Sequence, residues 1–219
     1  MKEREEGLER SKGLGKNFSR NRKRKDRSES DFYQTPYCLT EEFLRNHSIG
    51  RWSFESTIAD FCSGDGAIQV VLRRNGFLNL IERDLRRGDD FFDLDPEESY
   101  EYGLMNPPFR LFNDWVCQCY RIFSTEFCLL GPTTYLQGVG RYNSEGTGIF
   151  QHETWRLAYV YTFNRYPMLS IDLRQDGLIK TGMQTLSWFV FNRTDSICQL
   201  RWLDIDRYVH RKGTRRVNL

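Results

Sequence analysis

The tetrapeptide Asn106-Pro107-Pro108-Phe109 is the stretch whose residue types could do chemistry. Two prolines fix the backbone and remove two N–H donors, so a strand that enters this stretch must end there in a rigid, extended turn. The turn presents an asparagine carboxamide oxygen, the Pro107 carbonyl and an aromatic ring close together. Two neutral acceptors beside a stacking face suit a flat heterocycle that carries an amino group. A turn without any function is the competing interpretation, and the rest of the chain must decide between them.

A glycine loop upstream supplies that context. Asp60-Phe61-Cys62-Ser63-Gly64-Asp65-Gly66 follows a predicted strand, and its glycines allow a tight turn and the close approach of a ligand. The carboxylate of Asp60 can accept hydrogen bonds from an amino or hydroxyl group. A phosphate-binding loop would have a third glycine where this chain has Gln69, and Asp60 and Asp65 would repel a pyrophosphate. The pattern therefore favours a nucleoside ligand without phosphates.

Acidic residues follow the next predicted strand. A carboxylate at the end of that strand can accept two hydroxyl protons from a ribose, and both Glu82 and Asp84 qualify. Asp90 and Phe91 could then hold an adenine ring, with the carboxylate accepting from the exocyclic amine and the phenyl ring packing on the base. An acidic surface loop without a ligand is the alternative for each of these residues.

Strands and helices that could position these residues alternate along the chain. We expect strands near 56–61, 77–81, 102–105, 126–131 and 183–191, and helices near 40–44, 67–74 and 111–123. Residues 154–163 have mixed helix and strand character, and 198–209 could add an edge strand or a short helix. The alternation predicts an α/β fold with a mostly parallel sheet covered by helices on both faces. A glycine-rich stretch at 136–153 predicts a long mobile loop.

The net charge of +2 is unevenly distributed over the 219 residues. Residues 1–30 hold eleven Lys and Arg against six Asp and Glu, with few large apolar groups. This composition predicts a disordered basic tail that could follow nucleic-acid phosphates, with a merely solubilising tail as the alternative. We expect a single folded domain over 31–209 and a second basic tail over 210–219.

Cysteine and histidine usage argues against a metal site. The six cysteines include no CxxC pair, and only three histidines are present, which also argues against a histidine-driven catalytic triad. The cysteines and the lack of a leader-like apolar segment favour a reduced, cytoplasmic setting. No apolar run is long enough to span a bilayer, so we expect a soluble protein.

The two motifs together resemble a known family. Asp60-Phe61-Cys62-Ser63-Gly64-Asp65-Gly66 is similar to the S-adenosylmethionine loop of amino-group methyltransferases, and Asn106-Pro107-Pro108-Phe109 resembles their catalytic tetrapeptide, in the usual order. Gln34-Thr35-Pro36 resembles the N-terminal cofactor-contacting segment of N6-adenine DNA methyltransferases. Ser187-Trp188-Phe189-Val190 resembles a late core strand of phage-type members. The resemblance covers about residues 31–192.

This resemblance implies a Rossmann-like methyltransferase of phage or bacterial type that methylates the exocyclic N6 amine of adenine in DNA. Asn106 and the Pro107 carbonyl would accept hydrogen bonds from the target amine, Phe109 would stack on the flipped base, and Pro108 would keep the turn rigid. The implied cofactor is S-adenosyl-L-methionine. The residues expected to contact it are Tyr33, Thr35, Pro36, Asp60, Cys62, Ser63, Gly64, Gly66, Glu82, Asp84, Asp90 and Phe91.

Larger relatives use a separate target-recognition domain, for which this chain has no room. Recognition would then fall to the loops at 137–153 and 171–181 and to the basic ends. We expect a DNA substrate, no membrane and no metal, in a bacterial or phage-infected host cell. The oligomeric state, the recognition sequence and any restriction partner are not indicated. The alternatives are an RNA-base methyltransferase, a protein-glutamine N-methyltransferase and a catalytically inactive nucleic-acid-binding homologue; the intact Asn106, Gly64 and Gly66 argue against the last.

Overall fold

The computed structural model describes residues 33–48, 51–95, 97–167, 169, 182–195 and 197–208, all within one compact unit, Tyr33–Leu219. The predicted basic tails at 1–30 and 210–219 and the predicted recognition loop at 171–181 lie outside these residues. Within the described ranges, no helix is both long enough and apolar enough to cross a membrane.

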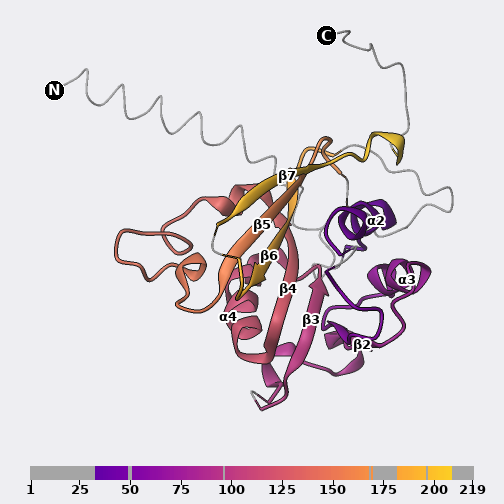
Figure 1. Ribbon diagram of the computed structural model, residues 1–219, viewed down its shortest axis with the longest axis horizontal. Coiled ribbons are helices and arrows are strands. Elements are labelled where there is room, and N and C mark those ends of the chain that lie inside the picture. Colours follow the sequence, from indigo (N-terminus) through magenta and orange to yellow (C-terminus); the bar gives the residue numbers. More distant parts are fainter. Residues whose placement is uncertain are drawn as a thin grey trace, which may run out of the picture. The chain divides into compact units, whose positions relative to one another are not determined.

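A seven-stranded sheet with the order β2-β1-β3-β4-β6-β5-β7 forms the centre of the fold (Figure 1). The strands are β1 Ile58–Asp60, β2 Leu80–Glu82, β3 Tyr100–Met105, β4 Phe123–Pro132, β5 Arg156–Phe163, β6 Leu186–Asn192 and β7 Gln199–Leu203. Parallel pairs join β1 to β2 and β3, β3 to β4, and β5 to β7, whereas β6 runs antiparallel to both β4 and β5. Among the described strands β6 alone is reversed, which confirms the predicted mostly parallel, Rossmann-like sheet.

Helices cover both faces of this sheet. Helices α2 Tyr37–Asn46 and α3 Ala67–Arg74 pack on one face, and α4 Phe112–Ile122 packs on the other. Alternation along β4 divides its side chains between the two layers, because successive residues of a strand point to opposite faces. Cys128 and Leu130 join the cluster under α2 and α3, while Phe127 and Leu129 join the cluster under α4.

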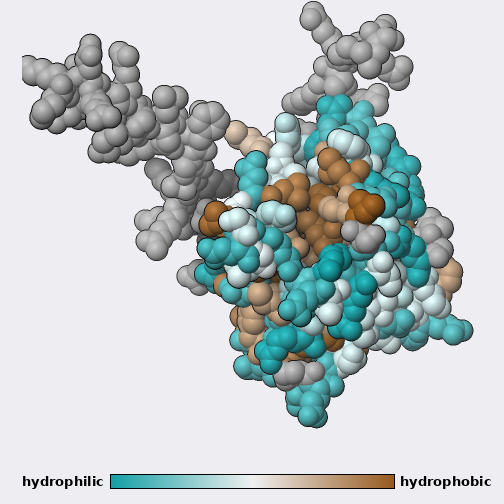
Figure 2. All heavy atoms as spheres, turned by 60° about the vertical axis from the view of Figure 1, so that its left-hand side comes forward, coloured by the Kyte–Doolittle hydropathy of each residue, from teal (hydrophilic) through white to brown (hydrophobic). Residues whose placement is uncertain are grey.

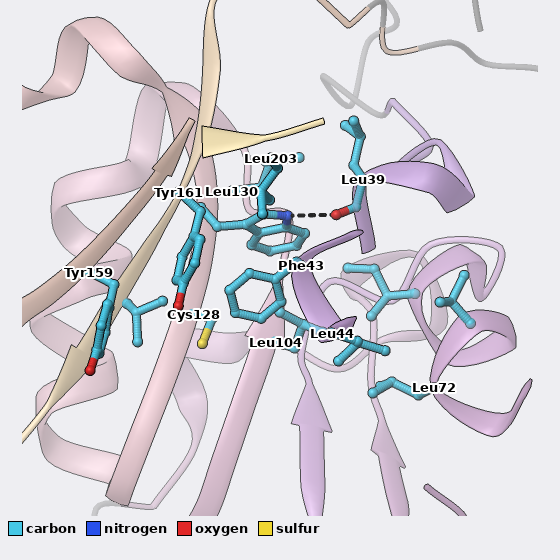
Figure 3. Packing of buried hydrophobic residues seen from close by; sticks show 14 of the residues in the cluster. Leu39, Phe43, Leu44, Leu72, Leu104, Cys128, Leu130, Tyr159, Tyr161 and Leu203 are labelled. Carbon is cyan, nitrogen blue, oxygen red and sulfur yellow. Dashed lines mark hydrogen bonds between the residues drawn. The ribbon is translucent and has the colours of Figure 1, made fainter. Parts of the chain in front are cut away.

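The layer under α2 is shown in Figure 3. Phe43 of α2 packs its ring against Trp188 and Tyr161 of the sheet, with ring centroids 5.1 and 5.4 Å apart. Trp188 Nε1 donates a 3.1 Å hydrogen bond to the Leu39 carbonyl, so the buried indole N–H is satisfied by the helix backbone. This contact fixes α2 over the centre of the sheet.

Helix α3 coincides with the predicted 67–74, and Gly76, at φ 93°, follows its end. Helix α2 begins before the predicted 40–44, because Pro36 is at the N-cap and its carbonyl accepts from Leu39 N at 3.0 Å. Thr40 Oγ1 is buried and has no partner among the described residues. The ambiguous 154–163 is strand β5, since it pairs with both β6 and β7.

A buried polar network fastens the end of α2 to β4. Glu126 is 4% exposed and accepts from His47 Nε2 and Trp52 Nε1, each at 2.7 Å, and from Asn192 Nδ2 at 3.3 Å. Burial alone would raise the pKa of Glu126, but these donors hold it below its usual value. Ligand atoms of His47, Glu126 and Cys128 lie within 4.8 Å of one another and could hold a metal ion. Because the carboxylate already has three donors, we assign the group a structural role.

Glu126→Gln should lower the free energy of unfolding by about 1.5–3 kcal/mol, the range for hydrogen bonds to a charged group. The pKa of Glu126 is lowered in the fold, so its contribution is complete above the unfolded-state value and is lost as the pH falls through the folded-state value. Urea unfolding from about pH 7 to about pH 3 should therefore show the variant converging on the wild type. The exposed Glu97→Gln is the control, and a difference that persists in acid would contradict this account.

Candidate active site

Three polar residues follow or end adjacent parallel strands. Asp60 and Glu82 are the last residues of β1 and β2 and lie opposite each other in register, and Asn106 directly follows β3. Because these strands are parallel, their carboxyl ends lie at the same edge of the sheet, where open α/β sheets bind ligands. The structure thus places the glycine loop and the tetrapeptide at the same edge of the sheet.

The Asn106 side chain is held by the segment that precedes α2. Its Nδ2 donates to the Tyr33 carbonyl at 3.1 Å and to Thr35 Oγ1 at 3.0 Å. Both amide hydrogens are used in this way, so Oδ1 is the atom of the carboxamide left to accept a hydrogen bond from a ligand. These contacts join residues 73 and 71 positions apart, and no local sequence signal indicates them. Residues expected to contact a cofactor therefore also orient the asparagine.

The rest of the tetrapeptide contacts the segment that follows β4. Pro107 is buried and Pro108 is half-buried. Phe109 is the first residue of the short helix η4 Phe109–Leu111, and the Phe109 ring packs partly against the core under α2. The Phe109 carbonyl accepts a 2.9 Å hydrogen bond from the hydroxyl of Tyr135. Tyr135 lies in η5 Thr133–Leu136, directly after β4, and was not among the predicted site residues.

The glycine loop turns through two left-handed residues, Gly64 at φ 56° and Gly66 at φ 80°, a region that favours glycine. Inside the turn Asp60 is 2% exposed. Its two carboxylate oxygens accept from Cys62 N at 3.0 Å and from Gln69 Nε2 at 2.8 Å, so the residue in place of a third glycine anchors the loop. Burial raises the pKa of Asp60 to about 7 despite these donors.

Cys62 and Ser63 follow the strand end at Asp60 in the glycine loop. Burial, with the nearby Asp60 carboxylate, raises the pKa of the Cys62 thiol well above its usual value. Ser63 Oγ is buried and has no hydrogen-bond partner among the described residues. A buried hydroxyl without a partner costs free energy unless a ligand or water meets it. Ser63 Oγ is therefore a group in the loop that could form a hydrogen bond with a bound molecule.

The structure separates the roles of Glu82 and Asp84. Asp84 is buried; one oxygen accepts from Gly64 N at 2.7 Å and the other from Arg86 N and Nε at 2.9 and 3.0 Å. Although burial opposes it, these bonds and the Arg86 charge hold the pKa of Asp84 below its usual value. Asp84 thus fastens the glycine loop to the loop after β2. Glu82 stays half-buried at the strand end, in an ion pair with Arg73 of α3.

Asp90 and Phe91 shape the next turn. The Asp90 carboxylate caps the short helix η3 Phe91–Asp93 by accepting from Phe92 N at 3.0 Å. Phe91 is 3% exposed, and the Trp115 ring stacks on it at a centroid distance of 3.9 Å. Its ring is part of the core, so packing against an adenine would require this loop to rearrange.

Comparisons with known proteins agree with the fold. No protein-family model matches the sequence, and no curated protein matches it. The chain is similar in structure to the type IIG restriction endonuclease BpuSI, with 15% identity and a TM-score of 0.54 over 78% of this chain and 26% of that one. It is also similar to the methyltransferase subunit of a type I restriction-modification system from Streptococcus thermophilus, with 13% identity and a TM-score of 0.53 over 83% and 49% of the two chains.

The chain therefore spans about a quarter of the first protein and about half of the second. At these identities the likeness shows the fold alone. The chain has the α/β fold of these restriction-modification enzymes, with its candidate site at the carboxyl edge of the parallel strands.

Asp60→Asn should make the protein relatively more stable as the pH rises. The pKa of Asp60 is about 7 in the fold, against an ordinary value of 3.8, so the unfolded chain ionises first and the wild type loses stability as the pH rises between these two values. The variant has no such loss. Gln69 Oε1 lacks a partner among the described residues, and if the Gln69 carboxamide flips, this oxygen can accept from the new asparagine amide. Unfolding free energies measured across this range should diverge by at most about 4 kcal/mol; a pH-independent difference would refute the assignment.

Proposed function

We propose that this protein is an S-adenosylmethionine-dependent methyltransferase that acts on the exocyclic N6 amine of adenine in DNA, by direct transfer to a flipped base. The observation that carries the proposal is the orientation of Asn106. Its amide hydrogens are held by Tyr33 and Thr35, and its Oδ1 is left to accept beside a glycine loop at the carboxyl edge of the sheet. An acceptor fixed in this way suits an amino group on a planar ring.

The cofactor fits the residues around the glycine loop. Ser63 Oγ lacks a partner among the described residues, and the left-handed Gly64 and Gly66 let a ligand approach the backbone. Both oxygens of the buried Asp84 accept from Gly64 and Arg86, whereas the half-buried Glu82 meets Arg73 through Oε1, so we propose Glu82 rather than Asp84 as the acceptor for the ribose hydroxyls. The buried Asp60, whose pKa is raised to about 7, would be ionised more fully beside a cationic ligand, so the two would favour each other. When bound, S-adenosylmethionine supplies an electrophilic methyl group.

The residues of the tetrapeptide would act by positioning. Asn106 Oδ1 and the Pro107 carbonyl accept from the target amine and draw its lone pair out of conjugation with the ring, which makes the nitrogen a better nucleophile. Phe109 provides the face on which the flipped base stacks. No group here has to remove a proton before the attack, so rigid placement supplies most of the catalysis.

DNA is the substrate that we favour among polymers with planar amino groups. The names of both similar structures, a restriction endonuclease and a restriction-modification methyltransferase subunit, support it. The decisive experiment incubates the pure protein with methyl-labelled cofactor and unmethylated duplex DNA, RNA or protein, and then digests each product. Label in N6-methyladenine from DNA is the expected result. Label only in RNA or in protein glutamine would replace the proposed substrate, and cofactor binding without any transfer would indicate an inactive homologue.

Asn106→Ala should lower methyl transfer by about 10²–10³-fold, since it removes an acceptor that polarises the amine. Cofactor affinity measured by calorimetry should stay close to that of the wild type. The exposed Asn79→Ala serves as the control for replacing an asparagine. Loss of both transfer and cofactor binding would show that Asn106 is structural.

Thr35→Val tests whether Thr35 orients Asn106. The change keeps the shape but removes the hydroxyl that accepts from Asn106 Nδ2, so kcat should fall about tenfold or more while the cofactor Kd is unchanged. Thr35→Ser keeps the hydroxyl and should retain kcat. A weaker cofactor Kd with normal kcat would instead support the sequence-based expectation that Thr35 acts only as a cofactor contact.

A further inference from the structure

The glycine-rich loop between η5 Thr133–Leu136 and η6 Ile149–Gln151 is held by its own polar groups. Asn143 Oδ1 accepts from the backbone N–H of Glu145 and of Thr147, each at 3.1 Å. Gln151 Oε1 accepts from Asn143 N at 2.8 Å, and Gln151 Nε2 donates to the Asn143 carbonyl at 3.0 Å. Backbone hydrogen bonds also close the loop; for example, Phe150 N donates to the Arg141 carbonyl at 2.9 Å. The expected mobile loop is thus a hydrogen-bonded unit that extends beyond α4 (Figure 1).

The same loop exposes two large side chains that do not help to hold it. Val139 is 81% and Tyr142 is 68% exposed. Most of the molecular face drawn in Figure 2 is hydrophilic, and apolar residues gather in only part of it. Isolated exposed apolar groups are common and need no function. Here, however, the two lie just before Asn143, in a turn closed by the hydrogen bonds of Arg141 N and Tyr142 N to the Gly138 carbonyl, so binding through them would cost little loop entropy.

A short series of contacts connects this loop to the tetrapeptide. Arg141, between the two exposed residues, donates from Nε to Asn113 Oδ1 at 3.1 Å and places its guanidinium 4.1 Å from the centre of the Tyr135 ring. The Tyr135 hydroxyl in turn donates to the Phe109 carbonyl at 2.9 Å. Val139 and Tyr142 are therefore kept at a fixed position relative to Phe109, the proposed platform for the target base.

We infer that Val139 and Tyr142 form an apolar wedge that enters the base stack of duplex DNA where the target base leaves it. The inference rests on the proposed function. Extruding a base leaves unstacked neighbours, and apolar side chains that insert at such a step compensate part of the unstacking cost. The exposed Arg110, next to Phe109, can meet the phosphates nearby. A wedge is needed only where a base must leave a stack, so it makes the loop a duplex-specific contact.

The test compares duplex with heat-denatured forms of the same unmethylated DNA, so the recognition sequence need not be known. Val139→Ala/Tyr142→Ala should lower transfer to the duplex about tenfold or more and leave transfer to denatured DNA nearly unchanged. Val139→Leu/Tyr142→Phe, which keeps the apolar bulk, should retain duplex transfer. Leu78→Ala, at an exposed position beside β2, is the control and should match the wild type on both forms.

Thermal unfolding and cofactor calorimetry of the alanine variant check that it is folded. Equal losses on both DNA forms, or no loss on either, would overturn the wedge while leaving the proposed function standing. A wild type that labels only denatured DNA would also overturn it. If the wild type labels neither form, the proposed function fails and the wedge fails with it.

Discussion

The parallel pairing of β1 with both β2 and β3 is the constraint on which the candidate site depends. β1 has only three residues, all buried, yet its register places Asp60 opposite Glu82 and Ala59 opposite Gly103. Gly103 is required there because a Cβ would lie 2.5 Å from the Phe123 ring of β4. A slip of one residue would turn each side chain to the other face of the sheet and separate the glycine loop from Asn106.

Electrostatics around the glycine loop depend on the hydrogen-bond donors that each buried carboxylate has. Asp60 and Asp84 are both buried, but burial dominates at Asp60, whereas the backbone N–H groups of Arg86 and Gly64 and the Arg86 guanidinium donate to Asp84, and the two pKa values move in opposite directions. Of these two carboxylates, Asp84 is firmly ionised and holds the structure, and Asp60 is the one whose ionisation a nearby cation would favour. The sequence-based interpretation that the loop favours a nucleoside ligand without phosphates stays a prediction.

Local signals in the sequence predicted the parts of the structure that local physics controls. Helix α3 begins after Gly66 and ends before Gly76 because both glycines adopt left-handed conformations that other residues disfavour. The contact of Thr35 with Asn106 could not be predicted, since it depends on tertiary packing across the whole sheet. The burial of Phe91 was missed for the same reason, because its partner Trp115 belongs to a later helix.

The order of the loop after β4 was missed for a different reason. Glycine, asparagine and serine are typical of mobile segments, but an asparagine can also replace backbone partners in a turn. Asn143 and Gln151 do so here, which closes the loop without a hydrophobic core of its own. Composition alone cannot distinguish the two cases, because the distinction depends on which amide faces which backbone group.

Contacts from two separate parts of the chain converge on the tetrapeptide. Tyr33 and Thr35 hold the Asn106 amide, and Tyr135 holds the Phe109 carbonyl. A site that works by hydrogen-bond polarisation gains most from such support, because a displaced acceptor loses much of its effect on the amine. The network around Glu126 stabilises the fold through residues that take no part in these contacts. The sheet can therefore keep its buried carboxylate at Glu126 paired while Asn106 Oδ1 and Ser63 Oγ have no hydrogen-bond partner among the described residues.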